Sequence, residues 1–228
     1  KGYTVMDVPF RHDMCITPGF VQAKGRPMED RQDLEAVRIL GDARFVNAGL
    51  MPPPPHWRLV ASTQKGMILS IPPTSCKFRG YDWKDAFHTC LLQNAEPFDK
   101  AWSRERKLKW VADLQGDDSS LLVVYEYNGE YDIFVGGGQG IAPMALFWNP
   151  HVQDALYFMF GEYWLAMSVL FVDDAIVHGT NEAHCDLRSD VFEDFSEVFS
   201  KPLSRKQWAN GIRPPAAGAA VTAGIEFV

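Results

Sequence analysis

The segment LFVDDAIVHG, residues 170–179, places two adjacent carboxylates, Asp173 and Asp174, between two apolar runs. The flanking runs are typical of buried strands, where an unpaired charge costs free energy. A tight hairpin lowers this cost, because the strands stay buried while both carboxylates lie at its tip and face a cleft. A divalent cation would relieve the repulsion between them, and hard oxygen ligands suit Mg²⁺. The alternative is an acidic β-turn, in which Asp is present because it favours turns.

A second acidic stretch is YDWKDAF, residues 81–87, which we expect to run from a strand into a turn. Asp82 is a candidate metal ligand in this stretch, and Asp85 follows it. Three carboxylates from two neighbouring strand ends form the usual protein part of a two-metal phosphoryl-transfer site. In a purely structural role, Asp82 would instead cap the N-terminus of a helix.

The composition is that of a globular protein, with 228 residues, of which 46% are hydrophobic and 22% charged. This length allows one large domain or two small ones. No apolar run approaches the roughly 20 residues of a membrane span, so we expect no membrane partner. Four scattered cysteines without a CxxC pair predict reduced thiols in an intracellular protein and argue against zinc. The chain begins at Lys1 without a leader, so we expect a piece of a longer protein or a processed end.

Apolar periodicity predicts an α+β fold, a sheet with helices on one face. The clearest hairpin spans 119–140, where two strands meet across Asn128-Gly129, a turn pair that tolerates positive φ. The other expected elements are a hairpin or flexible loop at 21–32, an extended proline-rich connector at 51–57, a short helix at 58–70, a strand leading into a turn or helix at 77–93, a charged amphipathic segment at 104–114 and a final strand at 214–228.

Two longer segments predict helices. Residues 142–164 are strongly apolar, with Pro150 early in the helix or at a kink, and residues 185–201 are amphipathic. The side chains expected on their buried faces are Ala142, Ala145, Leu146, Val152, Ala155, Leu156 and Met159 in the first helix, and Leu187, Val191, Phe195 and Val198 or Phe199 in the second.

Several other segments agree with the acidic hairpin. FVDD between apolar strands resembles the YxDD signature of reverse transcriptases. RILGDARFVN (38–47) resembles the fingers segment R-x-x-x-D-x-R-x-x-N of that family, and YDWKDAFHTCLL (81–92) is similar to its D-x-K-x-A-F-H-x-I motif. GGGQGIAPMALF (136–147) resembles the Q-G motif that opens the long palm helix, and PLSRKQW with AGIEF (202–208, 223–227) resembles the end of the palm. Each motif is weakly specific, but their shared order over nearly the whole chain is strongly specific.

The resemblance implies a right-hand polymerase with fingers and palm, an antiparallel palm sheet backed by helices, and no thumb in this chain. Residues 1–80 would be mainly fingers, with the connector at 51–57, and residues 81–228 mainly palm, with fingers returning near 94–135. The implied activity is RNA-directed DNA polymerization, the transfer of a dNTP onto a primer 3′-OH. The implied partners are an RNA template, a DNA primer, the dNTP, and further domains or subunits that supply a thumb.

In this resemblance Asp82 and Asp173 are metal ligands and Asp174 is the supporting third carboxylate. Together they would hold two Mg²⁺ ions, with Mn²⁺ as an alternative. Lys206 matches the palm lysine that is thought to protonate the leaving pyrophosphate. In a structural role it would be an exposed lysine.

The implied nucleotide contacts come from two segments. Phe87 matches the steric gate under the sugar, where a large ring leaves no room for a 2′-hydroxyl and so predicts use of dNTPs. Its structural alternative is a core Phe. The backbone N–H groups of Asp85 and Ala86 would hold the triphosphate. Gln139 and Gly140 match the motif that contacts the nucleotide and the template.

The fingers residues are assigned less directly. Arg38 matches the arginine that stacks on the incoming base and pairs with a phosphate. Lys24 is the candidate for the phosphate-binding lysine, with Arg26 or Arg31 as replacements, and all three could be solvated surface residues. The run Gly136–Gly138 departs from the family's Leu-Pro, and we interpret it as letting the backbone approach the template.

The net charge of −7 argues against a large nucleic-acid footprint, although basic residues gather at 104–109 and 201–206. The first hypothesis is an RNA-directed DNA polymerase of a retroelement, because a scaffold needs no anionic cluster. The second is a domesticated reverse-transcriptase-like domain serving as a structural subunit, which the acidic charge and missing thumb favour. A third is the palm of an RNA-templated RNA polymerase, against which Phe87 argues.

Overall fold

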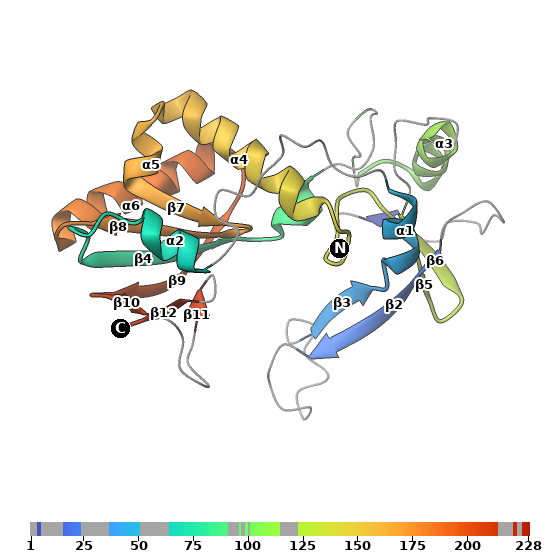
Figure 1. Cartoon of the computed structure of the whole chain (residues 1–228). Helices are drawn as coiled ribbons and strands as arrows, with labels where there is room; N and C mark the ends of the chain where they lie inside the picture. The colour runs from blue at the N-terminus through green and yellow to red at the C-terminus, as the bar shows by residue number, and fades with distance from the viewer. Residues whose placement is uncertain are drawn as a thin grey trace. The chain divides into compact units, whose positions relative to one another are not determined.

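The computed structural model describes residues 4–5, 16–23, 37–50, 64–90, 96, 99, 101–114, 123–213, 221–222 and 225–228. The chain divides into two compact units, each assembled from two stretches. Unit 1 comprises Lys1–Pro52 and Phe87–Met144, and unit 2 comprises Pro53–Ala86 and Ala145–Val228. Both contain helices and mainly antiparallel strands, which confirms the α+β class (Figure 1). The assignment of fingers and palm to parts of the chain stays a prediction.

Unit 1 is organised around one sheet with the strand order β1-β6-β5-β2-β3. Its strands are β1 (Thr4–Val5), β2 (Ile16–Ala23), β3 (Val37–Gly41), β5 (Val123–Tyr127) and β6 (Glu130–Phe134). Only the β2–β5 pairing among them is parallel. The hairpin across Asn128 and Gly129 is confirmed, with φ of 54° and 80° at these residues. The proline-rich connector and most of the predicted loop at 21–32 lie outside the described residues.

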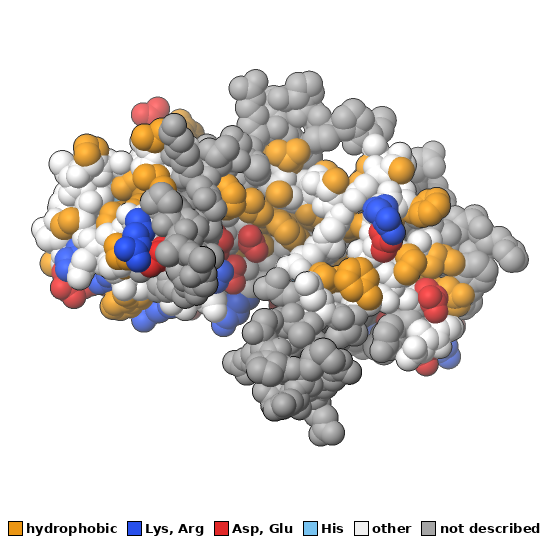
Figure 2. Space-filling model, turned by 60° about the horizontal axis from the view of Figure 1, so that its bottom comes forward, with side chains coloured by type: hydrophobic (Ala, Val, Ile, Leu, Met, Phe, Trp, Pro, Cys, Tyr) orange, Lys and Arg blue, Asp and Glu red, His pale blue; other side chains and the backbone are white. Residues whose placement is uncertain are grey.

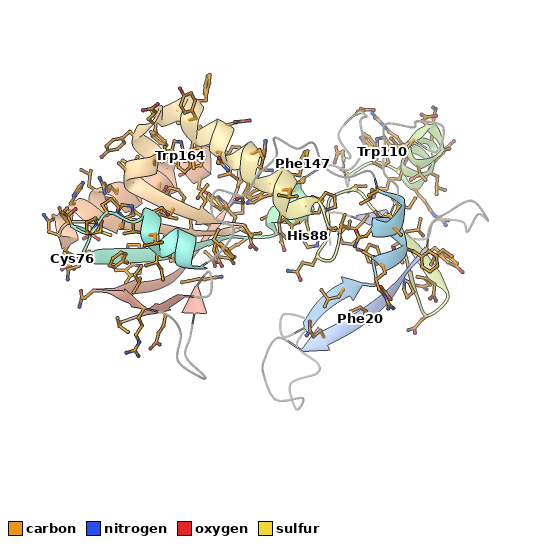
Figure 3. The ribbon with its side chains drawn as sticks, viewed as in Figure 1. Phe20, Cys76, His88, Trp110, Phe147 and Trp164 are labelled. Carbon is orange, nitrogen blue, oxygen red and sulfur yellow. The ribbon has the colours of Figure 1, made fainter. Side chains whose placement is uncertain are left out.

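Unit 1 contains three helices among its described residues, of which α3 packs on this sheet. They are α1 (Arg44–Gly49) and α3 (Arg104–Leu114), and the 3₁₀ helix η3 (Ala86–Thr89) begins at the unit boundary. Trp110 of α3, labelled in Figure 3, packs in a buried cluster with Val124 and Ile133 of the hairpin strands. This packing buries the apolar face of α3, the segment 104–114 that we predicted to be charged and amphipathic.

Unit 2 is built on a four-stranded antiparallel sheet with the order β7-β8-β4-β9. Its strands are β4 (Lys77–Trp83), β7 (Ser168–Phe171), β8 (Asp174–Gly179) and β9 (Leu203–Ala209). Its helices are α2 (Gln64–Ser70), α4 (Met144–Phe160, whose first residue belongs to unit 1), α5 (Tyr163–Met167) and α6 (Glu182–Val198). A small second sheet is formed by β10 (Ile212–Arg213), β12 (Ile225–Phe227) and β11 (Val221–Thr222).

The two faces of the four-stranded sheet carry different contacts. Tyr81 and Trp83 of β4 pack against Phe192 of α6, with ring centroids 5.6 and 5.4 Å apart. Phe78 packs with Ile176 on the opposite face, where Ile68 of α2 joins the cluster. The prediction that the helices share one face is therefore wrong for α2. Because side chains alternate along a strand, the residue between Tyr81 and Trp83 points away from α6.

The predicted buried face of α4 is only partly right. Trp148, Val152 and Leu156 are each fully buried, at every fourth position. Ala142 lies before the helix begins and is exposed, and Met159 is 44% exposed. The apolar content of this helix exceeds what one face can bury, so periodicity alone did not identify the face in contact.

The predicted buried face of α6 is wrong at Leu187 and Val198, which are 63% and 70% exposed. The buried positions include Cys185 and Ser189 instead. The helix runs close to β8, where a Cβ on Gly179 would lie 2.5 Å from the backbone nitrogen of Cys185. Near Gly179 such a close approach leaves room only for small side chains, whereas farther along the helix Phe192 and Phe195 are buried.

Two further sequence expectations concern membranes and thiols. Within the described part of the chain, no helix combines the length and the apolar character that a membrane span requires. Cys76, Cys90 and Cys185 are free thiols, whereas Cys15 lies outside the described residues.

Candidate functional site

The acidic hairpin is confirmed, but its tip differs from the predicted one. Val172 and Asp173 form the turn between β7 and β8, whereas Asp174 is the first residue of β8. Val172 has a φ of 58°, a left-handed conformation that is costly for a β-branched residue. Strain of this kind, of order 1–3 kcal/mol, persists only where the surroundings enforce it.

Two hydrogen bonds hold this strained turn. The buried side chain of Asn149 in α4 donates from Nδ2 to the carbonyl oxygen of Val172 at 2.7 Å. The backbone N–H of Trp83 in β4 donates to the carbonyl oxygen of Asp173 at 3.0 Å. The turn is therefore fixed from a helix and from the neighbouring strand. The sequence did not lead us to Asn149, although a polar residue within an apolar helical segment can indicate a buried, hydrogen-bonded side chain.

Asp82 and Asp174 are direct cross-strand partners in the β4–β8 pairing. Like charges that face each other across a sheet are destabilising. Lys206 of β9 compensates this repulsion, because its Nζ lies 2.9 Å from Asp174 Oδ1 and 3.3 Å from Asp82 Oδ1. Both carboxylate side chains are less than one-third exposed, at 29% for Asp82 and 17% for Asp174. The ion pairs are thus partly screened from water.

A β-bulge explains how Lys206 reaches both carboxylates. Along β4 the partner of Gly80 is Gln207, but the partner of the next residue, Tyr81, is Arg205. Lys206 is the extra residue of this bulge and has no partner on β4. Bulges re-aim side chains next to functional sites. The extra residue lets Lys206 point to the face of Asp82, while Arg205 bonds Glu193 on the face of α6.

The electrostatics of this cluster follow from burial and from neighbouring charge. Burial, together with the negative charges of Asp174 and Asp82, raises the pKa of Asp173 to about 6. Burial acts to lower the pKa of Lys206, but the hydrogen bond to Asp174 and the charge of Asp82 raise it overall. The cluster therefore favours a bound cation, and Lys206 supplies one.

The three carboxylates offer the hard oxygen ligands that Mg²⁺ prefers. Among the described residues, however, no group of three or more acidic, His or Cys side chains has the arrangement of a metal site. The ammonium group of Lys206 pairs with both Asp82 and Asp174. The donor chemistry of the three carboxylates fits a divalent ion, which Asp82 and Asp173 would hold with Asp174 in support.

A second set of predicted residues comes together in unit 1. The backbone of Gly136 and Gly137 packs directly on η3, where a Cβ on Gly136 would lie 1.9 Å from the carbonyl oxygen of His88. A Cβ on Gly137 would lie 2.6 Å from the carbonyl oxygen of Phe87, and Gly137 N–H donates to Cys90 at 2.7 Å. These glycines allow the loop to approach η3. The interpretation that the glycine run lets the backbone approach the template stays a prediction. The packing brings the Gln139 segment to the backbone of Phe87.

The remaining nucleotide candidates are placed as follows. Gln139 and Gly140 are exposed, and Gly140 has a φ of 96°. Asp85 is exposed with a φ of 53°, next to the buried Ala86. Arg38 lies in β3, paired with Gln22, but its side chain lies outside what the structure describes. Lys24, Arg26 and Arg31 lie outside the described residues.

Several Lys and Arg side chains in the basic stretches at 104–109 and 201–206 form ion pairs with acidic side chains. Arg106 pairs with Glu96 at 2.9 Å, and Lys109 pairs with Asp113 at 2.7 Å. In the second stretch Arg205 and Lys206 are both paired with acidic side chains. Figure 2 shows acidic and basic side chains interspersed on the visible face. The described surface in this view carries mixed charge.

No family model and no curated protein matches this chain. Among solved structures, a foamy viral protease-reverse transcriptase in complex with an RNA/DNA hybrid matches 90% of the chain, with a TM-score of 0.52 and 15% identity. The native protease-reverse transcriptase of prototype foamy virus matches 88%, with a TM-score of 0.50 and 15% identity. The chain spans 21% of each of those proteins. At such identity the likeness concerns the fold alone, and the chain has a reverse-transcriptase-like fold.

Proposed function

We propose that the chain is the nucleotidyl-transfer part of a reverse transcriptase, which adds dNTPs to a primer 3′-OH on an RNA template. The observation that carries this proposal is the acidic cluster, in which Asp82 and Asp174 face each other on adjacent antiparallel strands and Asp173 lies in the turn before β8. A bulge directs Lys206 at Asp82 and Asp174. A fold similar to that of reverse transcriptases supports the assignment. A structural domain has no physical need for this arrangement, because the repulsion between opposed carboxylates is destabilising and has to be offset by a further charge.

The acidic residues of the proposed site have separate roles. Asp82 and Asp173 would hold Mg²⁺ or Mn²⁺, with Asp174 as the supporting carboxylate. When bound, such ions lower the pKa of the attacking hydroxyl and stabilise the charge of the leaving pyrophosphate. The strained turn at Val172, held by Asn149, keeps the Asp173 carboxylate directed at the cluster. Lys206 is the cation of the site and would donate the proton that the pyrophosphate takes up.

The nucleotide would be bound by residues of the second cluster. Phe87 would exclude the 2′-hydroxyl and so select dNTPs, and Gln139 with Gly140 would contact the nucleotide and template. The packing of Gly137 against the backbone of Phe87 supports a common role, because it brings the two segments together within unit 1. The backbone of Asp85 and Ala86, with Arg38 and Lys24, would bind the phosphates.

The proposed partners are an RNA template and a DNA primer. The solved foamy viral enzyme is in complex with an RNA/DNA hybrid, and the shared fold makes the same class of partner the natural candidate here. The chain spans about a fifth of that protein, so a thumb would come from further domains or subunits.

One observation favours a second candidate function, a structural subunit of a larger assembly. The basic stretches at 104–109 and 201–206 are largely paired with acidic side chains, and the chain carries a net charge of −7. Phosphate contacts need unpaired Lys and Arg, so this charge pattern weakens the grip on a duplex.

Primer extension on an RNA template, with dNTPs and Mg²⁺, tests the two candidates. We expect extension by the wild type and a loss of at least about a hundredfold in Asp173→Asn, because a proposed metal ligand is removed. Asp113→Asn is the matched control, since Asp113 is an exposed carboxylate in a surface ion pair with Lys109. Equal extension by Asp173→Asn and wild type would contradict the catalytic role. A folded wild type that neither extends primers nor binds the hybrid would favour the structural subunit.

A further inference from the structure

The side chain of Asn47, in α1, bonds the loop between β6 and α4. Its Nδ2 donates to the carbonyl oxygen of Gly140 at 2.8 Å, and its Oδ1 accepts from the backbone N–H of Ala142 at 2.8 Å. Because one bond needs a donor and the other an acceptor, a single orientation of the amide satisfies both. Asp lacks the donor, and an apolar side chain of similar size lacks both groups. The two bonds thus clamp the peptide groups on either side of Ile141.

This clamp is one of two anchors of the loop. At the other anchor, Gly136 and Gly137 pack on η3, and Gly137 N–H donates to Cys90. Between the anchors lie the exposed Gln139 and Gly140, the latter with a φ of 96°. A loop held at both ends presents its exposed residues in one conformation, whereas a loop held at one end samples several.

Asn47 lies at a hollow of the surface and not inside the core of unit 1. Its side chain is half-buried, and together with Gly140 it lines a hollow in unit 1. Asp42 and Arg44, which form an ion pair, lie on the wall of the same hollow. Each hydrogen bond contributes only about 1 kcal/mol net, so their loss should loosen the loop without unfolding the unit.

We propose that Asn47 is a positioning residue for nucleotide binding, which acts by holding Gln139 and Gly140 in their binding conformation. The inference rests on the proposed function, in which these two residues contact the nucleotide. None of the proposed catalytic or binding residues has such a positioning role. Asn47 acts through Gln139 and does not touch the reacting atoms.

A double-mutant cycle on the full chain tests this proposal. Asn47→Ala and Gln139→Ala should each raise the KM for dNTP about tenfold, with kcat little changed. If Asn47 acts through Gln139, the double mutant should show no more than the larger single effect, because coupled residues are not additive. An increase of about a hundredfold, the product of the single effects, would overturn the proposal. Asn210→Ala is the matched control, because Asn210 is an exposed Asn that bonds Lys77 in unit 2.

Amide hydrogen exchange separates this proposal from the proposed function. Asn47→Ala should speed exchange in residues 138–142 and leave the hairpin β5–β6 unchanged, and Asn47→Asp, which keeps only the acceptor, should do the same. Unchanged exchange in both variants would overturn the positioning role, whatever the activity. If the wild type extends no primer but the loop exchanges faster in the variants, the proposed function fails and the clamp on the loop stands.

Discussion

In unit 2, three charged candidates lie on the strands of one sheet: Asp82, Asp174 and Lys206. In unit 1, by contrast, Gln139 and Gly140 lie on a loop that is held through its backbone. In unit 2, opposed carboxylates are held by the charge of Lys206 and by a strained turn. In unit 1, glycines pack on η3, and Asn47 bonds backbone atoms. The first arrangement should respond to charge and pH, and the second to volume and backbone conformation.

This contrast shows that a group's chemistry decides which substitutions it tolerates. A carboxylate in the cluster can be replaced by an amide of nearly the same shape, which tests charge alone. An L residue at Gly136 or Gly137, in contrast, would displace a backbone atom of η3. Stability measurements, which do not depend on activity, separate the response to charge and pH from the response to volume and backbone conformation.

The largest expected effect is at Gly136. An Ala there would place its Cβ 1.9 Å from the carbonyl oxygen of His88, so the loop must separate from η3. We expect Gly136→Ala to lower the free energy of unfolding by about 3 kcal/mol or more, measured by denaturant titration. Gly49→Ala is the control, because no heavy atom lies within 4 Å of its Cβ position. Equal stability of the two variants would show that the loop does not depend on this packing.

The next effect is a loss of stability at low pH, which arises from a buried histidine of unit 2. Burial, together with the positive charge of Arg188, lowers the pKa of His178 in β8 to about 4. Below about pH 6.5, His178 is therefore protonated in the unfolded chain but stays neutral in the folded chain. The contribution of neutral, buried His178 to stability is lost as the pH falls toward 4. The loss should approach roughly 1.4 kcal/mol per pH unit.

His178→Gln tests this effect. The stability difference between wild type and variant should be greatest above pH 6.5 and shrink as the pH falls to 4, measured by denaturant titration at each pH. His184→Gln, at a histidine that bonds Thr180 near the surface, is the comparison. A difference that stays constant over this range would mean that His178 does not titrate as its burial implies.

A smaller effect is expected at Lys206. Lys206→Met removes the cation between Asp82 and Asp174 and leaves two opposed carboxylates. Because the group is partly exposed, we expect a loss of about 1–2 kcal/mol, much of which Mg²⁺ should restore. Lys109→Met breaks an exposed helical ion pair and should cost less than about 0.5 kcal/mol. Equal losses in the two variants would contradict a special role for the bulge.

The smallest effect is expected in the hairpin of unit 1. Gly129 has a φ of 80° but no heavy atom within 4 Å of its Cβ position, so only backbone strain opposes a side chain. Gly129→Ala should cost about 1 kcal/mol in thermal or denaturant unfolding. A loss as large as that of Gly136→Ala would mean that conformation, and not volume, dominates in this unit.

The sequence by itself determined the elements whose signals lie within a few residues. The β5–β6 hairpin follows from Asn128-Gly129, the acidic hairpin from two apolar runs around Asp173, and the α+β class from their order. In each case the turn residues and the strand pattern are adjacent, so local conformation and burial agree without reference to the rest of the chain. The candidate acidic residues were found for the same reason, since two carboxylates in an apolar run are visible in any window.

Only the tertiary structure decided which groups meet. The bulge that aims Lys206 at Asp82 and Asp174 depends on the register between β9 and β4, and no local pattern encodes that register. The buried face of α6 follows from its close approach to Gly179, which favours Cys185 and Ser189 over Leu187. The bonds of Asn47 to the loop join residues far apart in the sequence. Packing and pairing at long range select among the conformations that local preferences allow, and they alone bring these residues together.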